Sequence, residues 1–281
     1  MGRVESEYYR RDALGVVHPR ASGAVRIVSL VPSLTELVFA LGLGDKVVGR
    51  TGFCIHPRGA IRRVPKLGGT KDVDVAKLRA LSPTHLIVNI DENRREAVDE
   101  LRQDVPHVIV THPLIPNDNV ALYRMFGAIF GREAAAAALA AKFEAAKVAM
   151  QASVADLPPE RVLYLIWRKP WFTVARSTYI AATLALARWY TLPAMETGAR
   201  YPTLSDDDLA WSEADRILLS SEPYAFRERD RAALQAELRD RLGREAAVTL
   251  IDGEMTSWYG SRAIAGLEYL ARFRRSLSSG T

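Results

Sequence analysis

Two residues that can act as metal ligands or reactive groups lie two positions apart in the first quarter of the chain. They are Cys54 and His56, in the segment TGFCIHP at residues 51–57, which is expected to form a loop after a strand. A thiolate and an imidazole together ligate transition metals. A closed zinc site needs four ligands, and the sequence contains no second CxxC or HxxxH cluster. Metal ligation, nucleophilic chemistry and a simple ligand contact are all retained as hypotheses for this pair.

Large aromatic side chains gather at two places in the second half of the chain, each expected to be a loop at the end of a strand. They are Trp167, Trp171 and Phe172 at one place, and Trp258 and Tyr259 at the other. Aromatic rings accompanied by a few polar groups suit a pocket for a large, flat, amphipathic ligand. The pattern predicts such a pocket, with packing between two lobes as the alternative.

Acidic residues follow matching strands in the two halves of the chain. The apolar runs at residues 86–88 and 217–219 lie 131 positions apart, and at the same spacing Asp91 matches Glu222. Each acid comes just past the carboxyl end of its strand, where open α/β sheets bind ligands. The two acids are therefore predicted to line a ligand site, although a shared fold unit without a shared site would give the same pattern.

The elements that must position these side chains alternate between strands and helices. Short β-branched runs predict strands at residues 26–31, 46–49, 85–89, 107–110, 162–167, 216–219 and 247–251. Helices are predicted between strands of the first half, at 34–41, 75–81 and 93–102. Ser33 is expected to cap the first helix, with Glu36 three residues later. This alternation predicts parallel sheets covered by helices on both faces.

One long run of strong helix formers joins the two halves. Residues 132–155 contain neither Gly nor Pro, and a helix over them would measure roughly 36 Å. A helix of this length can connect two lobes. We therefore predict an N-terminal extension at 1–25, an N-terminal α/β lobe at 26–131, a connecting helix at 132–156 and a C-terminal α/β lobe at 157–281.

Composition and charge argue against several functional classes. The 38 Lys and Arg residues exceed the 33 Asp and Glu residues by only five and are spread along the chain, and no nucleic-acid-binding motif accompanies them. A single cysteine excludes an internal disulfide. No GxGxxG, GxxxxGK[ST] or GxSxG motif occurs, so nucleotide-binding and hydrolase classes lack their local signature. We expect neither a nucleic-acid partner nor an enzyme.

The hydropathy pattern predicts a protein that is not embedded in a membrane. No stretch approaches the roughly 20 apolar residues needed to span a bilayer. Charged residues at positions 5–12 interrupt the apolar run that a signal peptide requires. The expected location is therefore cytoplasmic for the sequence as written, and periplasmic if the start codon is mis-assigned.

Four segments of the sequence resemble a known family. They are DALG at 12–15, RIVSLVPSLTELVFALGLGDKVVG at 26–49, GGTKDVDVAKLRALSPTHLIV at 68–88 and SWYGSR at 257–262. They resemble the substrate-binding proteins of ABC importers that are built on a helical backbone and bind cobalamin, iron siderophores and heme. The resemblance covers Asp12 to Leu277 and is greatest to the cobalamin-receptor-like branch.

The resemblance implies two small parallel-sheet α/β lobes joined by one long rigid helix. It further implies reversible binding of a corrinoid or an iron or metal chelate in the cleft between the lobes, with no covalent cofactor and no catalytic residue. Most of the ligand-binding residues that we predict are taken from the matching positions of the family. Three of them, His56, Arg94 and Tyr259, are predicted from the chemistry of their side chains instead. The predicted ligand-binding residues are Ser33, Phe53, Cys54, His56, Thr70, Lys71, Asp91, Glu92, Arg94, Trp167, Trp171, Phe172, Glu222, Tyr224, Met255, Trp258 and Tyr259.

Two departures from the family pattern concern the ligand and the partner. Lys71 and Met255 replace aromatic residues of the cobalamin receptors, which favours a smaller chelate or an anionic group that pairs with Lys71 and Arg94. Family members dock to a membrane permease through an acid on each lobe; the second-lobe position is Asp207 here, but the first-lobe position is Ala76. A cytosolic chelate-processing enzyme, or a chelate sensor outside transport, is therefore the alternative.

Overall fold

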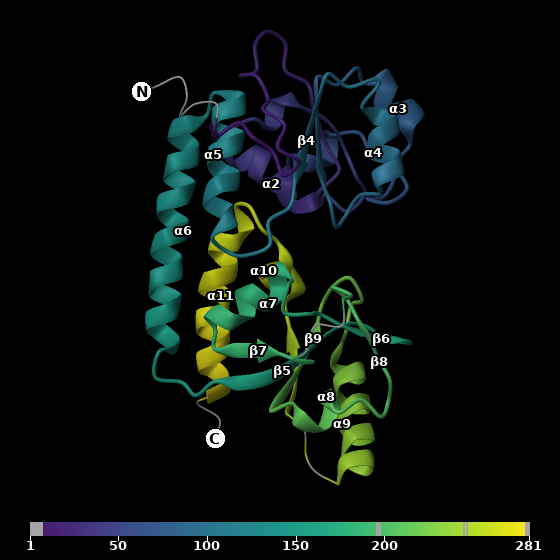
Figure 1. Cartoon of the computed structure of the whole chain (residues 1–281), viewed down its shortest axis with the longest axis vertical. Helices are drawn as coiled ribbons and strands as arrows, with labels where there is room; N and C mark the ends of the chain where they lie inside the picture. Colours follow the sequence, from purple (N-terminus) through teal and green to yellow (C-terminus); the bar gives the residue numbers. More distant parts are fainter. Residues whose placement is uncertain (1–7, 195–197, 244, 246, 279–281) are drawn as a thin grey trace. The chain divides into compact units, whose positions relative to one another are not determined.

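The computed structural model describes residues 8–194, 198–243, 245 and 247–278 (Figure 1). The described residues form two compact units. Unit 1 takes its residues from Met1–Pro113, Asn117–Glu144 and Tyr259–Arg262. Unit 2 takes its residues from Leu114–Pro116, Ala145–Trp258 and Ala263–Thr281. The chain therefore passes between the units several times, and one of these passages falls inside the SWYGSR segment.

Unit 1 contains a four-stranded parallel sheet with the strand order β2-β1-β3-β4. The strands are β1 (Ile27–Ser29), β2 (Val47–Arg50), β3 (His85–Asn89) and β4 (His107–Thr111). The helices of this part of the chain are α2 (Pro32–Ala40), α3 (Val75–Ala80), α4 (Arg95–Leu101) and α5 (Asp118–Phe130), with 3-10 turns at Gly44–Lys46 and Ile61–Arg63. All five residues of β3 are buried, as expected for a strand covered on both faces.

Helix α2 begins two residues before the predicted position, and the expected Ser33 cap is wrong. The N-cap residue is Val31, and its side chain makes no capping hydrogen bond. Pro32 occupies the start of the helix, where its fixed φ suits the helix and its missing N–H costs nothing. Ser33 therefore lies inside the first turn and is buried.

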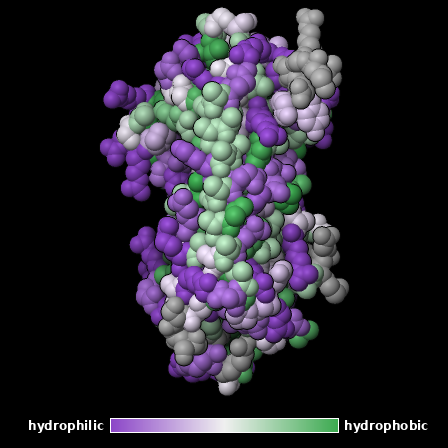
Figure 2. Space-filling view, turned by 90° about the vertical axis from the view of Figure 1, so that its left-hand side faces the viewer, coloured by the Kyte–Doolittle hydropathy of each residue, from purple (hydrophilic) through white to green (hydrophobic). Residues whose placement is uncertain are grey.

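Helix α6 (Glu133–Val154) is continuous for 22 residues, which corresponds to about 33 Å. It starts in unit 1 and ends in unit 2, because the division between the units falls after Glu144. Its outer face is rich in alanine and appears as a pale green strip in the space-filling view (Figure 2). High helix propensity along the whole segment explains its continuity across the boundary.

Unit 2 contains a six-stranded mixed sheet. Its strands are β5 (Glu160–Trp167), β6 (Trp171–Thr173), β7 (Trp189–Thr191), β8 (Thr203–Leu204), β9 (Arg216–Ser220) and β10 (Ala247–Ile251). β5 pairs in parallel with β7 and β9, and β9 with β10, whereas β6 is antiparallel to both β5 and β8. The helices are α7 (Tyr179–Leu186), α8 (Ala210–Glu213), α9 (Glu228–Leu242), α10 (Gly253–Ser257) and α11 (Arg262–Ser278), the last of which starts in unit 1.

The predicted fold class is confirmed: parallel-stranded α/β units and one long helix are present. Strands β3 and β9 match residue for residue at the predicted spacing of 131 positions, from His85 to Arg216 and from Asn89 to Ser220. Asp91 and Glu222 thus both lie two residues beyond their strands. Within the described residues, no helix combines the length and apolar character that crossing a bilayer requires.

Candidate ligand-binding surfaces

The strand ends of unit 1 carry exposed apolar side chains, which we call the unit 1 surface. Phe53 and Ile55 follow β2 and are 62% and 44% exposed, and Ile90 follows β3 and is 45% exposed. Exposed large apolar residues at the carboxyl ends of parallel strands are typical of ligand sites. The sequence analysis predicted Phe53 but missed Ile55 and Ile90, although an apolar residue directly before two acids was a usable signal.

Hydrogen bonds fix the loop that carries the predicted acids of unit 1. The buried Asn89 accepts from the backbone N–H of Asp91 (2.8 Å) and donates to Thr111 (3.3 Å). Asn93 accepts from the backbone N–H of Asn89 (2.9 Å) and donates to the Thr70 carbonyl oxygen (2.9 Å). The carboxylate of Asp91 lies 3.4 Å from the His112 ring nitrogen Nε2. This loop is therefore held from both ends.

Tyr259 supports Glu92 from inside unit 1. The Tyr259 hydroxyl donates to Glu92 Oε1 at 2.5 Å. Burial, followed by the charge of Glu92, raises the pKa of Tyr259 well above its ordinary value. Tyr259 thus stays a protonated donor, and its ring is buried. In the structure, Tyr259 holds a predicted contact residue in place, and its own contact with a ligand stays a prediction.

The segment after Tyr259 is anchored to unit 1 by three further contacts. The Gly260 N–H donates to Asn119 Oδ1 (2.6 Å), and its carbonyl accepts from Tyr123 (2.8 Å). Arg262 forms a bidentate ion pair with Glu36 at 2.8 and 2.9 Å. Gly260 has φ +77°, a left-handed conformation that favours glycine.

Cys54 does not face the unit 1 surface, so its predicted contact with a ligand is corrected. Its side chain is fully buried, and Sγ lies within hydrogen-bonding distance of the Thr35 and Thr51 hydroxyls, at 3.1 and 3.2 Å. Burial raises the pKa of the Cys54 thiol, which disfavours the thiolate that binds metals and attacks carbonyls. His56 is half-buried. In the described part of the chain, no group of three or more His, Cys, Asp or Glu side chains could hold a metal ion.

The remaining predicted residues of unit 1 are polar. Lys71 is exposed, and Thr70 is half-buried. Arg94 forms an exposed ion pair with Asp72 at 3.7 Å. The basic side chains that were predicted to receive an anionic ligand group are therefore accessible to solvent.

Aromatic rings at the end of β5 form what we call the unit 2 surface. Trp167 is 41% exposed and meets Tyr224 edge to face, with 5.8 Å between the ring centroids. Phe172, the neighbour of Trp167 across the antiparallel β5–β6 pair, is half-buried. Met255 is half-buried on helix α10. These four predicted residues keep part of their surface accessible.

Trp171 is a core residue, which corrects its predicted ligand contact. Its ring stacks on Phe226 (6.2 Å, 10°) and meets Trp211 edge to face (5.5 Å). Strand β6 explains the difference between Trp171 and Phe172, because successive side chains of a strand point to opposite faces. The sequence predicts a loop here, and a strand of three residues gives too short a pattern to show this alternation.

Glu222 forms the polar part of the unit 2 surface. Its Oε1 atom accepts hydrogen bonds from Ser257 Oγ and Trp258 Nε1, both at 2.8 Å. Burial raises the pKa of Glu222, with support from the charges of Glu254 and Asp252, while the bonds from Ser257 and Trp258 oppose the shift. Trp258 itself is 9% exposed.

A glycine makes room for the Glu222 side chain. A Cβ atom added at Gly253 would lie 2.5 Å from Glu222 Cγ and 2.5 Å from Ser220 Oγ. Real Cβ atoms do not approach other atoms so closely. Glycine at the start of α10 is therefore part of the arrangement that lets Glu222 reach Trp258.

The predicted docking residue Asp207 is exposed in the turn before α8.

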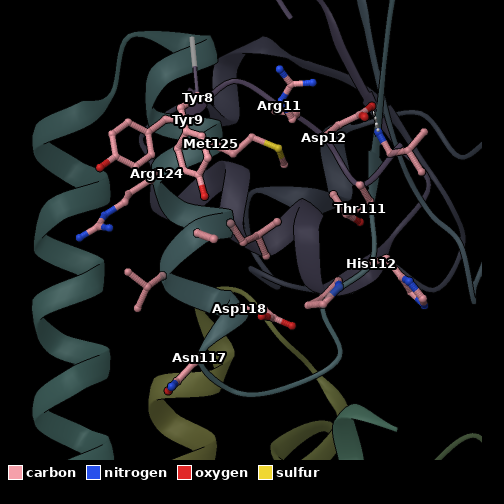
Figure 3. A pocket seen from close by; sticks show the side chains of 16 residues that line it. Tyr8, Tyr9, Arg11, Asp12, Thr111, His112, Asn117, Asp118, Arg124 and Met125 are labelled. Atoms are coloured by element: carbon pink, nitrogen blue, oxygen red, sulfur yellow. Dashed lines mark hydrogen bonds between the residues drawn. The ribbon is translucent and has the colours of Figure 1, made fainter. Parts of the chain in front are cut away.

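A separate cavity of about 500 Å³ lies in unit 1 beside the end of β4 and helix α5 (Figure 3). Its lining includes Tyr8, Tyr9, His112, Arg124 and Met125, and none of the predicted site residues. The guanidinium of Arg124 lies over the Tyr9 ring, 5.6 Å from its centroid. The sequence analysis gave no indication of this cavity.

Comparisons with known proteins agree with this architecture. Among curated relatives, an uncharacterized ABC transporter substrate-binding lipoprotein, YvrC, from Bacillus subtilis (strain 168) is 40% identical over 78 residues, or 28% of this chain and 24% of that protein. The matching stretch is thus about a quarter of that relative's length.

Two solved structures share the fold over most of the chain. The periplasmic vitamin B12 binding protein BtuF of Vibrio cholerae has a TM-score of 0.75 at 19% identity, covering 91% of this chain and 98% of that one. A periplasmic heme binding protein from Pseudomonas aeruginosa has a TM-score of 0.76 at 22% identity, covering 88% and 91%. A family model described as periplasmic binding protein matches residues 27–243. Because this match spans well over half of the sequence, the chain belongs to the periplasmic binding protein family.

Proposed function

We propose that the protein is the substrate-binding component of an ABC transporter and binds a large, amphipathic metal chelate, either a corrinoid or a heme-like iron chelate. The observation that carries the proposal is that the strand ends of each unit hold both an exposed aromatic ring and a half-buried acid that accepts a hydrogen bond. Phe53 accompanies Glu92 in unit 1, and Trp167 accompanies Glu222 in unit 2. The relatives support this ligand class, since by their names one binds vitamin B12 and another binds heme.

The proposed activity is reversible binding without a covalent step. Rings supply contact area, and each large ring that becomes buried contributes about 1.5 to 3 kcal/mol. The acids and the basic side chains of Lys71 and Arg94 orient the polar edge of the ligand. The alternative of a chelate-processing enzyme with a reactive Cys54 gains no support, because this thiol is buried and its pKa is raised.

The first prediction tests the unit 2 surface with Trp167→Ala. We expect the wild type to bind dicyanocobalamin or hemin with a Kd below about 100 μM, and the variant to bind at least about tenfold more weakly, because one large contact ring is lost. Ligand absorbance during titration of the purified protein measures both values.

Tyr190→Ala is the matched control for this test. Tyr190 is 46% exposed, much like Trp167, but it pairs with Arg161 near the start of β5 and so lies at the opposite end of that strand. We expect this variant to bind as the wild type does. Wild-type protein that binds neither chelate more tightly than about 100 μM would reject the proposed ligand class.

Partner and location complete the proposal. We propose that an ABC permease is the partner and that Asp207 contributes to docking, since this exposed acid can pair with a basic surface. The cytoplasmic location expected from the sequence stays a prediction. The proposed transport role requires a periplasmic location instead. Fractionation of the native host with a specific antibody decides between the two: recovery in the periplasm would overturn the cytoplasmic prediction, and recovery in the cytoplasm would contradict the transport role.

A further inference from the structure

Glu222 couples a titratable carboxyl to an aromatic side chain of unit 2. Both Ser257 and Trp258 donate to the same oxygen, Oε1, at 2.8 Å. Hydrogen bonds to an ionised carboxylate are roughly twice as strong as those to a neutral acceptor. The charge of Glu222 therefore determines how firmly the Trp258 ring is held.

The surroundings of Glu222 favour the neutral form of its carboxyl. Among the described residues no ion pair of Glu222 is present, and the charges of Glu254 and Asp252, at the start of α10, help to raise its pKa. Tyr164 on β5, fully buried, also lies close enough to interact electrostatically with Glu222, and burial raises the pKa of Tyr164 above its ordinary value, so it stays neutral. The hydroxyl oxygen of Tyr269, on α11, accepts a hydrogen bond from the backbone N–H of Asp252. Burial and like charges thus act together against ionisation.

We propose that Glu222 is a proton-linked positioning residue: its ionised form holds Trp258 and Ser257 in the binding arrangement, and its protonation loosens them and weakens ligand binding. The inference rests on the proposed function and adds a pH dependence to the same surface. Because burial and the charges of Glu254 and Asp252 raise the pKa of Glu222, this change occurs at a higher pH than in a fully solvated glutamate.

The second prediction tests this inference by titrating hemin and dicyanocobalamin into wild type and Glu222→Gln between pH 5 and pH 8.5. Glutamine has nearly the same shape and never ionises. We expect wild-type affinity to fall about tenfold from pH 8.5 to pH 5, as expected when two charge-assisted bonds weaken. We expect the variant to bind about tenfold more weakly than wild type at pH 8.5 and with little pH dependence.

Tryptophan fluorescence of the ligand-free protein provides a second readout, which a purely structural role of Glu222 would not change. We expect a pH-dependent transition in wild type that is absent from Glu222→Gln and Trp258→Phe. Trp189→Phe is the matched control, since Trp189 donates to a different carboxylate, that of Glu160, at 2.9 Å. This control should keep the transition. Glu254→Gln should move the midpoint to lower pH, because it removes one like charge.

The outcomes separate this inference from the proposed function. Equal pH profiles for wild type and Glu222→Gln, in binding or in fluorescence, would overturn it, as would wild-type binding that strengthens on acidification. If the wild type binds neither chelate at any pH, the proposed function fails, and the binding part of the inference fails with it. The fluorescence transition then still decides whether Glu222 positions Trp258.

Discussion

Two glutamates of unit 2 accept an indole N–H, and their other contacts give them different roles. Glu160 accepts from Trp189 and forms ion pairs at 3.0 Å with Arg216 and with the buried Arg274. Burial opposes its ionisation, but the bonds from Arg216 and Trp189 outweigh this effect, so the pKa of Glu160 is lowered. Glu160 is thus a compensated structural charge at the start of β5. Among the described residues, no arginine or lysine forms an ion pair with Glu222. Of these two glutamates, Glu222 is therefore the one that we expect to gain a proton on acidification.

The third prediction concerns His85, a buried residue at the start of β3. Burial, and then the charges of His107 and His18, lower the pKa of His85 to about 4. Its Nε2 atom has no hydrogen-bond partner among the described residues, and its ring centroid lies 4.8 Å from that of His107. The folded state therefore holds His85 neutral, whereas an unfolded histidine takes up a proton near pH 6.5.

The sign of the effect follows from this difference in proton binding. The contribution of neutral His85 is fully present above about pH 6.5 and is lost as the pH falls from there toward 4. We expect the free energy of unfolding of wild type to fall by roughly 2 to 3 kcal/mol more than that of His85→Gln over this range. Urea denaturation at several pH values measures the difference, and parallel pH profiles for the two proteins would contradict the prediction.

Strand β6 provides a test at the scale of one element. The alternation of its side chains places Trp171 in the core and leaves Phe172 partly exposed. The fourth prediction is that Trp171→Ala lowers the free energy of unfolding by about 3 to 5 kcal/mol, through lost burial and the cavity left behind. Phe172→Ala should cost about 1 kcal/mol, since less of its surface is buried.

Denaturation midpoints for the two variants measure these costs, and equal costs would contradict the assignment of Trp171 to the core. The sequence placed Trp171 among the ligand-binding residues, whereas its packing predicts that Trp171→Ala acts mainly through stability. If that variant loses ligand binding, we expect a parallel loss of folded protein. Phe172→Ala separates the two effects because it should leave the fold intact.

The longer regular elements could be predicted because their sequence patterns are local. Strands β3 and β10 have the predicted limits, and helix α6 (Glu133–Val154) is shorter by one residue at each end than the predicted helix-forming run 132–155. Strands β6 and β8 escaped prediction because two or three residues carry too little periodicity, and they exist only through pairing with distant parts of the chain. Helix α5 was missed as well, although the left-handed Gly131 that ends it was a readable stop signal.

The candidate surfaces could be predicted by strand position but not by side-chain direction. The acids at strand ends were recognised because the period of 131 residues makes them equivalent. Whether a side chain near a strand end points outward depends on tertiary neighbours. Cys54 and Ile55 are adjacent, yet Cys54 is enclosed by two threonine hydroxyls and Ile55 is exposed. No local pattern distinguishes such neighbours.

At the scale of the whole molecule, the fifth prediction concerns the continuity of α6. The helix passes from unit 1 to unit 2 without Gly or Pro, the residues at which helices most readily kink. We therefore expect the radius of gyration to change little on ligand binding. Small-angle scattering with and without hemin measures this change. A contraction as large as that of receptors that close about flexible hinge strands would contradict the prediction.

The passage between the units at residues 258 and 259 has a consequence for protein engineering. The side chain of Trp258 donates a hydrogen bond to Glu222 in unit 2. The next residue, Tyr259, donates a hydrogen bond to Glu92 in unit 1. No spacer separates the two anchored side chains, so the chain here has no slack to absorb an extra residue. Inserting an affinity tag, a fluorescent reporter or a permuted terminus within 257–262 would therefore disturb both surfaces at once.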